Sequence, residues 1–382
     1  MKNALGALLA LLTLPLAAHA AFTPPPPDIQ GSSYVLMDYT SGDVIASKDP
    51  ELRVAPASIT KTMTLYIVFD LLKKGRLHMG DKAVVSEAAW RTGLDSSASR
   101  MFLDLHSQVS VQDLIRGIIV SSGNDASITI AEHVAGSVDA FAALMNQYAK
   151  QLGMTHSHFT NPDGLPDPEL YSTAGDLALL ARHLIRDFPQ YYPMFAEKEF
   201  TYNGIKQLNR NRLLFTDPSV DGLKTGFTDA AGYCLLASAH RNDRRMISIV
   251  MGTKSAKYRN VANEQLLNYG FQFFETAQLL GKGQPAVQAR VYKGASEQLP
   301  VGTVDPLFIA LPRGESKSVK IVPTLKGPIL APVAAGQVVG SAAIVLGDKT
   351  LNTVPLVALQ EVPKGGLVHR LVDQARLWMG AH

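Results

Sequence analysis

The order of apolar and polar positions predicts a hairpin followed by helices in the first half of the chain. Residues 34–48 form two apolar runs around the turn Thr40-Ser41-Gly42, as in a β-hairpin. From Ala57 the apolar residues recur at helical spacing as far as Gly75, a residue that commonly ends helices. A second helical region is expected from Ser110 to about Gly153, with Ser110 and Asp113 as a capping pair.

Strands return later in the same region. Thr173 precedes another helical pattern, residues 232–240 and 245–252 alternate like paired strands, and a helix is expected from about Val261 to Phe274. Strands at both ends with helices between them indicate an α+β fold, in which an antiparallel sheet is flanked by helices.

The pattern changes after Glu275. Gly281, Gly283 and Pro285 suggest a linker, and short β-branched runs then alternate with Pro and Gly. The expected strands are 287–292, 307–311, 319–322, 338–345 and 354–359. We therefore expect a first domain over residues 21–283 and a small all-β domain over residues 284–362.

The two ends of the chain have their own patterns. Lys2, an apolar stretch from Ala4 to Leu16 and the small-residue site Ala18-His19-Ala20 predict a secretory signal peptide over residues 1–20. Residues 363–382 predict an amphipathic helix after the break Gly365-Gly366. With secretion, this favours peripheral attachment to a membrane surface through residues 364–382, although a helix packed on the β domain is the alternative.

Composition adds limits. Of 382 residues 46% are hydrophobic and 18% charged, which is typical of a globular protein, and the net charge is +3. No dense Lys/Arg run indicates nucleic-acid binding. Cys234 is the single cysteine, so no disulfide forms within the chain, and its apolar neighbours favour a buried thiol.

Candidate chemistry begins at Ser58-Ile59-Thr60-Lys61, at the mouth of the first helix. Three-residue spacing places Ser58 and Lys61 on one helix face, where a lysine of lowered pKa could activate the serine as a nucleophile. Alone, the motif is better explained by a capping serine and a solvated lysine.

Two further motifs change this balance. Ser122-Gly123-Asn124 and Lys224-Thr225-Gly226 follow in the order known from penicillin-binding proteins and class A β-lactamases. The chain resembles the low-molecular-mass penicillin-binding proteins of the D-alanyl-D-alanine carboxypeptidase type. That resemblance implies a β-lactamase/transpeptidase-like catalytic domain, a small β domain and a membrane-tethering helix.

The resemblance also implies a role for each matching residue. Ser58 would attack the penultimate D-alanine carbonyl, Lys61 would be the base, and Ser122 would relay a proton to the leaving amine. Substrate binding would fall to Asn124, Lys224, Thr225, Gly226 and Arg210. The backbone N–H groups of Ser58 and Phe227 would form the oxyanion hole.

Two positions depart from the usual family pattern. Phe227 stands where a histidine often follows Lys-Thr-Gly, which leaves the rate of deacylation open. Asp163-Gly164-Leu165-Pro166 replaces the usual His-Gly-Leu-Asp, so the contacts of that loop do not transfer.

The expected substrates are peptidoglycan stem peptides ending in D-Ala-D-Ala, with β-lactams as acylating inhibitors, on the periplasmic side of the inner membrane. A D,D-endopeptidase, a class A β-lactamase and a non-catalytic wall-binding module are the alternatives. Asp167 and Tyr171 stand where a lactamase deacylation loop has Glu and Asn. No cofactor is expected, and His156-Ser157-His158 has too few neighbouring ligands for a metal site.

Overall fold

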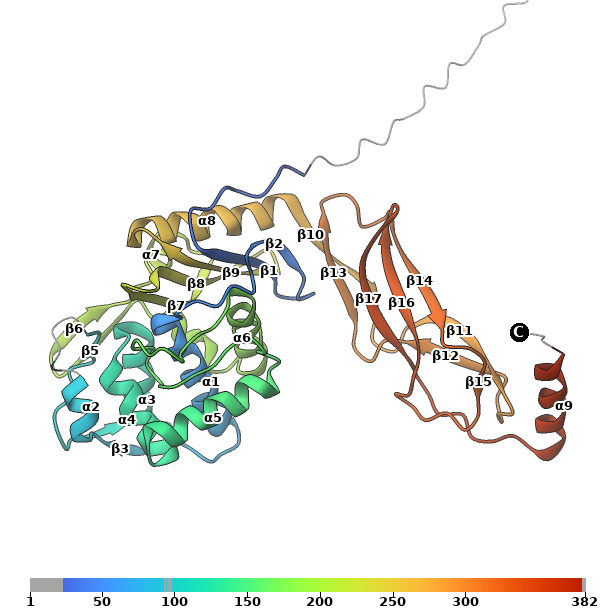
Figure 1. The fold of residues 1–382 in the computed structure, drawn as a ribbon, viewed down its shortest axis with the longest axis horizontal. Helices are drawn as coiled ribbons and strands as arrows, with labels where there is room; N and C mark the ends of the chain where they lie inside the picture. The colour runs from blue at the N-terminus through green and yellow to red at the C-terminus, as the bar shows by residue number, and fades with distance from the viewer. Residues whose placement is uncertain (1–22, 93, 95–97, 380–382) are drawn as a thin grey trace, which may run out of the picture.

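The computed structural model describes residues 23–92, 94 and 98–379, so the predicted signal peptide lies outside the described residues. The chain forms two parts, an N-terminal part of sheet and helices and a β-rich part that ends in a helix (Figure 1). The predicted α+β class of the first part is confirmed.

A five-stranded antiparallel sheet forms the centre of the N-terminal part. Its strand order is β2-β1-β9-β8-β7, so the sheet joins the two sequence ends of this part, as expected. The strands are β1 (Ser33–Asp38), β2 (Val44–Lys48), β7 (Val220–Thr228), β8 (Gly232–Arg241) and β9 (Arg244–Thr253). Two small two-stranded sheets lie apart from it: β3 (Lys82–Val84) with β4 (Gln108–Ser110), and β5 (Glu199–Tyr202) with β6 (Ile205–Leu208).

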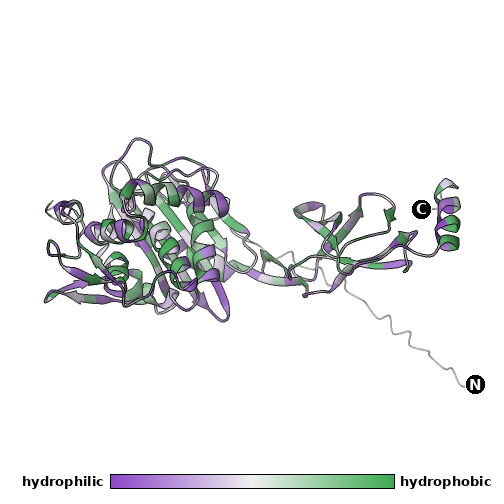
Figure 2. Ribbon diagram, turned by 90° about the horizontal axis from the view of Figure 1, so that it is seen from below, coloured by the Kyte–Doolittle hydropathy of each residue, from purple (hydrophilic) through white to green (hydrophobic). Residues whose placement is uncertain are grey.

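Both faces of the central sheet are buried. Along β8, Leu236 joins the core under the helical half of the domain, whereas its neighbour Leu235 joins a second core beneath α8. Successive side chains of a strand point to opposite faces, so a continuous apolar run supplies both cores. Figure 2 shows these apolar strands between the helices. Cys234 is fully buried in the first core, as its neighbours predicted.

The helices cover the two faces unequally. They are α1 (Lys61–Lys73), α2 (Glu87–Thr92), α3 (Val111–Arg116), α4 (Asn124–Ala135), α5 (Val138–Gln151), α6 (Ala174–Asp187), α7 (Leu213–Thr216) and α8 (Ala256–Phe273). Short helical turns are η1 (Ala57–Thr60), η2 (Gly117–Ser121) and η3 (Tyr192–Ala196).

Ser110 and Thr173 cap α3 and α6 as expected, but the region predicted as helical from Ser110 to Gly153 is divided. Ser122 has φ of +58°, which ends the α3–η2 segment. Helix α8 begins at Ala256, five residues before the expected Val261, because Ser255 caps it.

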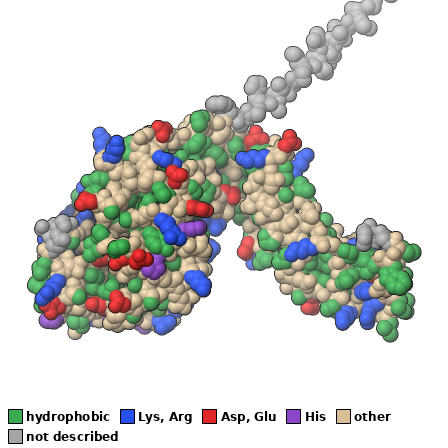
Figure 3. Space-filling view, viewed as in Figure 1, with side chains coloured by type: hydrophobic (Ala, Val, Ile, Leu, Met, Phe, Trp, Pro, Cys, Tyr) green, Lys and Arg blue, Asp and Glu red, His purple; other side chains and the backbone are tan. Residues whose placement is uncertain are grey.

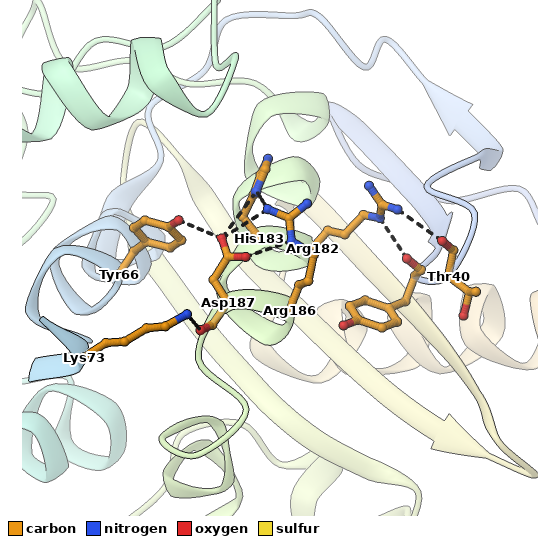
Figure 4. A network of polar contacts seen from close by, with 8 residues as sticks. Thr40, Tyr66, Lys73, Arg182, His183, Arg186 and Asp187 are labelled. Carbon is orange, nitrogen blue, oxygen red and sulfur yellow. Dashed lines mark hydrogen bonds and ion pairs between the residues drawn. The ribbon is translucent and has the colours of Figure 1, made fainter. Parts of the chain in front are cut away.

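A polar network fixes α1, which carries Lys61, to the rest of the domain (Figure 4). The hydroxyl of Tyr66 donates to Asp187 at 2.8 Å, and Lys73 donates to the backbone oxygen of the same residue. Arg182 of α6 donates to the backbone oxygens of Tyr39 and Thr40 after β1. Helix α1 is thereby tied to the end of α6, and α6 to the β1–β2 turn.

The β-rich part has a six-stranded sheet of order β14-β16-β17-β12-β11-β15 and a separate pair, β10 with β13. Its strands are β10 (Phe274–Leu280), β11 (Pro285–Tyr292), β12 (Gln298–Gly302), β13 (Leu307–Pro312), β14 (Val319–Leu325), β15 (Ile329–Leu330), β16 (Val338–Leu346) and β17 (Lys349–Ala358). Strand β10 follows α8 directly and pairs with β13, so pairing in this part begins before residue 284. Figure 3 shows a deep notch between the two parts below this junction.

Helix α9 (Leu367–Trp378) ends the described chain and contacts β11. Its contact is polar: the backbone N–H of Lys293 donates to the buried carboxylate of Asp373, and Lys293 Nζ donates to Gln374 at 2.6 Å. Leu367, Val368, Leu371, Trp378 and Met379 remain between 71% and 85% exposed. The apolar face of α9 therefore has no cover from the described chain.

Candidate active site

Ser58 lies in the η1 turn that runs directly into α1. It is partly exposed, whereas Ala57 and Ile59 on either side of it are buried. Ala57 has φ of +47°, and the backbone N–H of Ile59 donates to Pro56 O at 3.1 Å. The tight turn therefore buries its apolar neighbours and leaves the Ser58 hydroxyl accessible.

Lys61 is completely buried one turn further along. Its Nζ donates to Ser58 Oγ at 3.0 Å, to Asn124 Oδ1 at 2.8 Å and to the backbone oxygen of Asp163 at 2.5 Å. Burial lowers the pKa of Lys61 to about 8; the positive charge of Arg210 acts in the same direction, and nearby Asp163 opposes it. A fraction of this amine is therefore uncharged at neutral pH.

Ser122 and Lys224 form a second buried pair. The left-handed backbone of Ser122, between η2 and α4, brings its hydroxyl to 2.9 Å from Lys224 Nζ. Asn124 begins α4, and its N–H donates to Ser99 O at 2.8 Å. Burial holds the pKa of Lys224 well below the usual lysine value, and the positive charge of Lys61 adds to the effect. Two lysines that repel one another therefore share the site.

Strand β7 carries the third motif along the edge of the central sheet and packs against η1. A Cβ on Gly226 would lie only 3.1 Å from Pro56 O, so the strand approaches the serine turn as closely as a glycine allows. Lys224 and Thr225 are buried, but Phe227 is 47% exposed, with its ring centroid 4.3 Å from that of Tyr233.

Two cavities meet at Ser58, and Ser99 and Phe227 also line both. The larger, about 600 Å³, has a basic wall. Its charged residues are Arg210, Arg212, Lys257 and Arg259, and no described residue that lines it is acidic. The smaller, about 380 Å³, is lined by Asn124, Asp163 and Asp229 among others. The serine thus lies between a cationic subsite and a subsite that contains carboxyl groups.

The structure brings all the predicted site residues together, and it adds some that the sequence did not indicate. Arg210 lines the basic cavity, where Asn209 and Asn211 on either side of it are buried. Arg259 of α8 is 7% exposed; its Nη1 donates to Gly226 O at 3.1 Å, and its buried Nε has no partner among the described residues. A single arginine near a helix start carries no signal in the sequence, because its place beside β7 depends on the packing of α8.

Residues 23–92, 94 and 98–379 contain no group of three or more His, Cys, Asp or Glu side chains suited to holding a metal ion. Burial raises the pKa of the Cys234 thiol to about 11, so this thiol is not a nucleophile at neutral pH.

The site combines the partly exposed Ser58 with the buried Lys61 that contacts it, and it contains a second buried pair of Ser122 and Lys224. This arrangement defines the class of active-site-serine enzymes in which a lysine takes the place of the histidine. Comparison with known proteins agrees. Residues 20–255 match the family described as D-alanyl-D-alanine carboxypeptidase, peptidase S11, and residues 274–364 match the penicillin-binding protein 5 C-terminal domain. The chain belongs to this family of D-alanyl-D-alanine carboxypeptidases.

Individual relatives cover nearly the whole chain. The D-alanyl-D-alanine carboxypeptidase DacA of Haemophilus influenzae is 44% identical over 91% of this chain and 89% of its own length. DacA of Escherichia coli K12 is 42% identical over 95% and 94%. The crystal structure of penicillin-binding protein 5 from H. influenzae superposes with a TM-score of 0.85 at 43% identity, covering 89% of this chain and all of that one. The predicted family, fold class and enzymatic activity are confirmed.

Proposed function

We propose that the chain removes the terminal D-alanine from peptidoglycan pentapeptide stems through an acyl-Ser58 intermediate, with Lys61 as the base. The observation that carries this proposal is the 3.0 Å contact between Lys61 Nζ and Ser58 Oγ, in which the lysine is fully buried. A serine hydroxyl becomes a strong nucleophile only when an adjacent base takes its proton.

The three contacts of Lys61 serve both protonation states: the ammonium donates to all three oxygens, and the free amine can donate to two of them and accept from the third. A free amine has two N–H donors and one lone pair. Its donors serve Asn124 Oδ1 and Asp163 O, the two shorter contacts, and its lone pair accepts the proton of Ser58. The oxygen acceptors therefore orient the lone pair towards the nucleophile.

Proton transfer then completes acylation. The Ser58 Oγ–carbonyl bond forms, the peptide C–N bond breaks, and the proton taken by Lys61 must reach the departing D-alanine nitrogen. Ser122 is suited to relay it because its hydroxyl is held by Lys224 at 2.9 Å and lines the cavity beside Ser58. Deacylation is the reverse transfer, with water as the nucleophile and Lys61 again as the base.

The basic cavity is suited to the terminal carboxylate of the substrate. Lys224 and Thr225 would hold that carboxylate, with Arg210 and Arg259 adding positive charge. Charge-assisted hydrogen bonds of this kind are about twice as strong as neutral ones. The same cavity suits the carboxylate of a β-lactam, whose ring amide then takes the place of the scissile bond.

The oxyanion hole would consist of the backbone N–H groups of Ser58 and Phe227. The close packing of Gly226 on the serine turn supports this assignment, because it brings the two backbone segments together. Removal of one such donor costs about 10²–10³ in rate.

Location is a further part of the proposal: export by the signal peptide and peripheral attachment to the periplasmic side of the inner membrane by residues 364–382. Helix α9 supports this, because Asp373 and Gln374 bind Lys293, the residue after β11, while the apolar residues of the helix remain exposed. No single described helix is long and apolar enough to span a membrane; α4 and α5 pass that test only as a bent pair.

Mass spectrometry of the mature chain tests the chemistry. Incubation with penicillin should give an adduct on the peptide that contains Ser58, and a peptide ending in D-Ala-D-Ala should release D-alanine. Ser58→Ala should lose both, whereas Ser41→Ala, in the half-buried turn after β1, should lose neither. Release of D-alanine by Ser58→Ala would reject the assignment of the nucleophile.

A further inference from the structure

The loop 161–165 is bound to the helix that carries the proposed base. Lys61 Nζ donates to Asp163 O, and one turn later Thr64 Oγ1 donates to Pro162 O at 2.6 Å. A Cβ on Gly164 would lie only 1.9 Å from Ala57 O, so this loop also presses on the residue before Ser58. The position of the loop is therefore determined from both sides of the nucleophile.

The carboxyl group of Asp163 is the unusual feature of this loop. The residue is 2% exposed; its Oδ1 accepts from the Leu165 N–H at 3.2 Å. Its Oδ2 is buried and has no hydrogen-bond partner among the described residues. A buried carboxylate without a partner is costly, and its cost falls when a positive charge lies nearby. The nearby positive charge is Lys61, which the backbone of the same aspartate already contacts.

We propose that Asp163 is a positioning residue for Lys61, and that its buried carboxylate sets the charge state of the amine that activates Ser58. The proposal rests on the role of Lys61 under Proposed function and adds to it a control that lies outside the three motifs. Although Asp163 lines the smaller cavity, its carboxyl group is buried, and we assign its effect to Lys61.

Four charged groups act on Lys61, and their signs can be compared. Asp163 is the strongest of the neighbouring charges and favours the ammonium, as does Asp125, whereas Arg210 favours the free amine. The fourth is Lys224, whose own pKa the charge of Lys61 depresses. Asp125 is already held by the backbone N–H groups of Met101, Leu103 and Ala126. Asp163 has no such set of donors, so its charge is compensated mainly by Lys61.

The consequence has a definite direction. Burial raises the pKa of Asp163, and the positive charge of Lys61 opposes that rise. Removal of a charged Asp163 carboxylate removes a stabiliser of the ammonium, so the pKa of Lys61 falls further below about 8. The free amine then persists to lower pH.

The pH dependence of the acylation rate by a fluorescent penicillin tests this. In Asp163→Asn, which keeps the Oδ1 acceptor for Leu165, the acidic limb of the profile should move to lower pH by about one unit. The matched control is Asp167→Asn, an exposed carboxylate two residues after this loop, whose profile should equal that of the wild type. Asp163→Ser is a second neutral variant. The pH profile is judged in whichever of the two variants keeps the melting temperature of the wild type.

An acidic limb that stays in place in a folded neutral variant overturns the proposal. The role of Lys61 is checked separately with Lys61→Met. Loss of acylation in that variant with an unmoved limb in Asp163→Asn rejects only the role of Asp163. Retained acylation in Lys61→Met rejects the proposed base itself.

Discussion

The hydroxyl of Ser122 lies 2.9 Å from Nζ of Lys224, although the two residues are 102 positions apart in the chain. The contact joins the α4 side of the site to the edge strand β7. It also orients the Ser122 hydroxyl beside the cavity that Ser58 lines. If Ser122 relays a proton to this amine, its loss affects the chemical step more than substrate binding.

Ser122→Ala should therefore lower the acylation rate by about 10²–10⁴, the usual contribution of general acid–base catalysis. The matched control is Ser121→Ala. Ser121 is the preceding residue, is equally buried, and its Oγ has no hydrogen-bond partner in the described part of the chain. Stopped-flow acylation by a chromogenic cephalosporin measures both. Equal rates in the two variants would contradict a relay through Ser122.

The pKa of Lys61 makes a second prediction, on the wild-type protein. Only the free amine accepts the Ser58 proton, so acylation should increase with pH and level off above about 8. The free energy of unfolding should also depend on the protonation of Lys61. Since folding lowers this pKa from its usual 10.5, the unfolded chain binds more protons between pH 8 and 10.5. The contribution of Lys61 to the free energy of unfolding therefore rises with pH in that window. An acylation profile that is flat between pH 6 and 9 would contradict the assigned base.

Arg210 is predicted to recognise the terminal carboxylate. Arg210→Gln should raise KM about tenfold for a peptide ending in free D-Ala-D-Ala, because one charge-assisted bond is lost. It should leave KM unchanged for the same peptide with a C-terminal amide. Lys206→Gln is the control, since that exposed lysine pairs with Glu199 away from the cavity. Equal losses on both peptides would indicate a structural role for Arg210.

The parts of the site that could be predicted from the sequence are those carried by local patterns. Ser58, Lys61 and Ser122 sit in short motifs, and Ser110 and Thr173 cap the expected helices. Long-range packing supplies the rest: Asp163 reaches Lys61 across 102 positions, and Arg259 reaches Gly226 across 33. Strand β12 was not predicted, because it is short and contains Pro300 and so shows no regular alternation of apolar and polar residues. The break before α4 depends on the left-handed backbone of Ser122, which a serine does not indicate.

Membrane attachment through α9 is tested with the full-length mature chain and vesicles of bacterial lipid. Leu371→Glu places a charge on the exposed apolar face and should reduce co-flotation at least tenfold, since a buried leucine contributes about 1.5–3 kcal/mol. Val304→Glu is the control, because Val304 is 65% exposed on the β-rich part and lies outside α9. A chain that ends at Pro363 should remain in solution and keep its activity. Flotation of that shortened chain would reject α9 as the anchor.

The contact between Gly164 and the serine turn makes the last prediction. Gly164 has φ of +81°, and an added Cβ would lie 1.9 Å from Ala57 O, so Gly164→Ala must displace either the loop or the turn that presents Ser58. Gly75→Ala separates the two causes, because Gly75 has φ of +66° and nothing within 4 Å of an added Cβ. Gly75→Ala should lower the free energy of unfolding only by the backbone strain of a left-handed alanine, about 1–2 kcal/mol, and should leave acylation intact. Gly164→Ala should lower the free energy of unfolding, measured by chemical denaturation, by more than this, and it should also slow acylation by penicillin. Equal stability and equal acylation in the two variants would show that loop 161–165 does not hold the nucleophile in place.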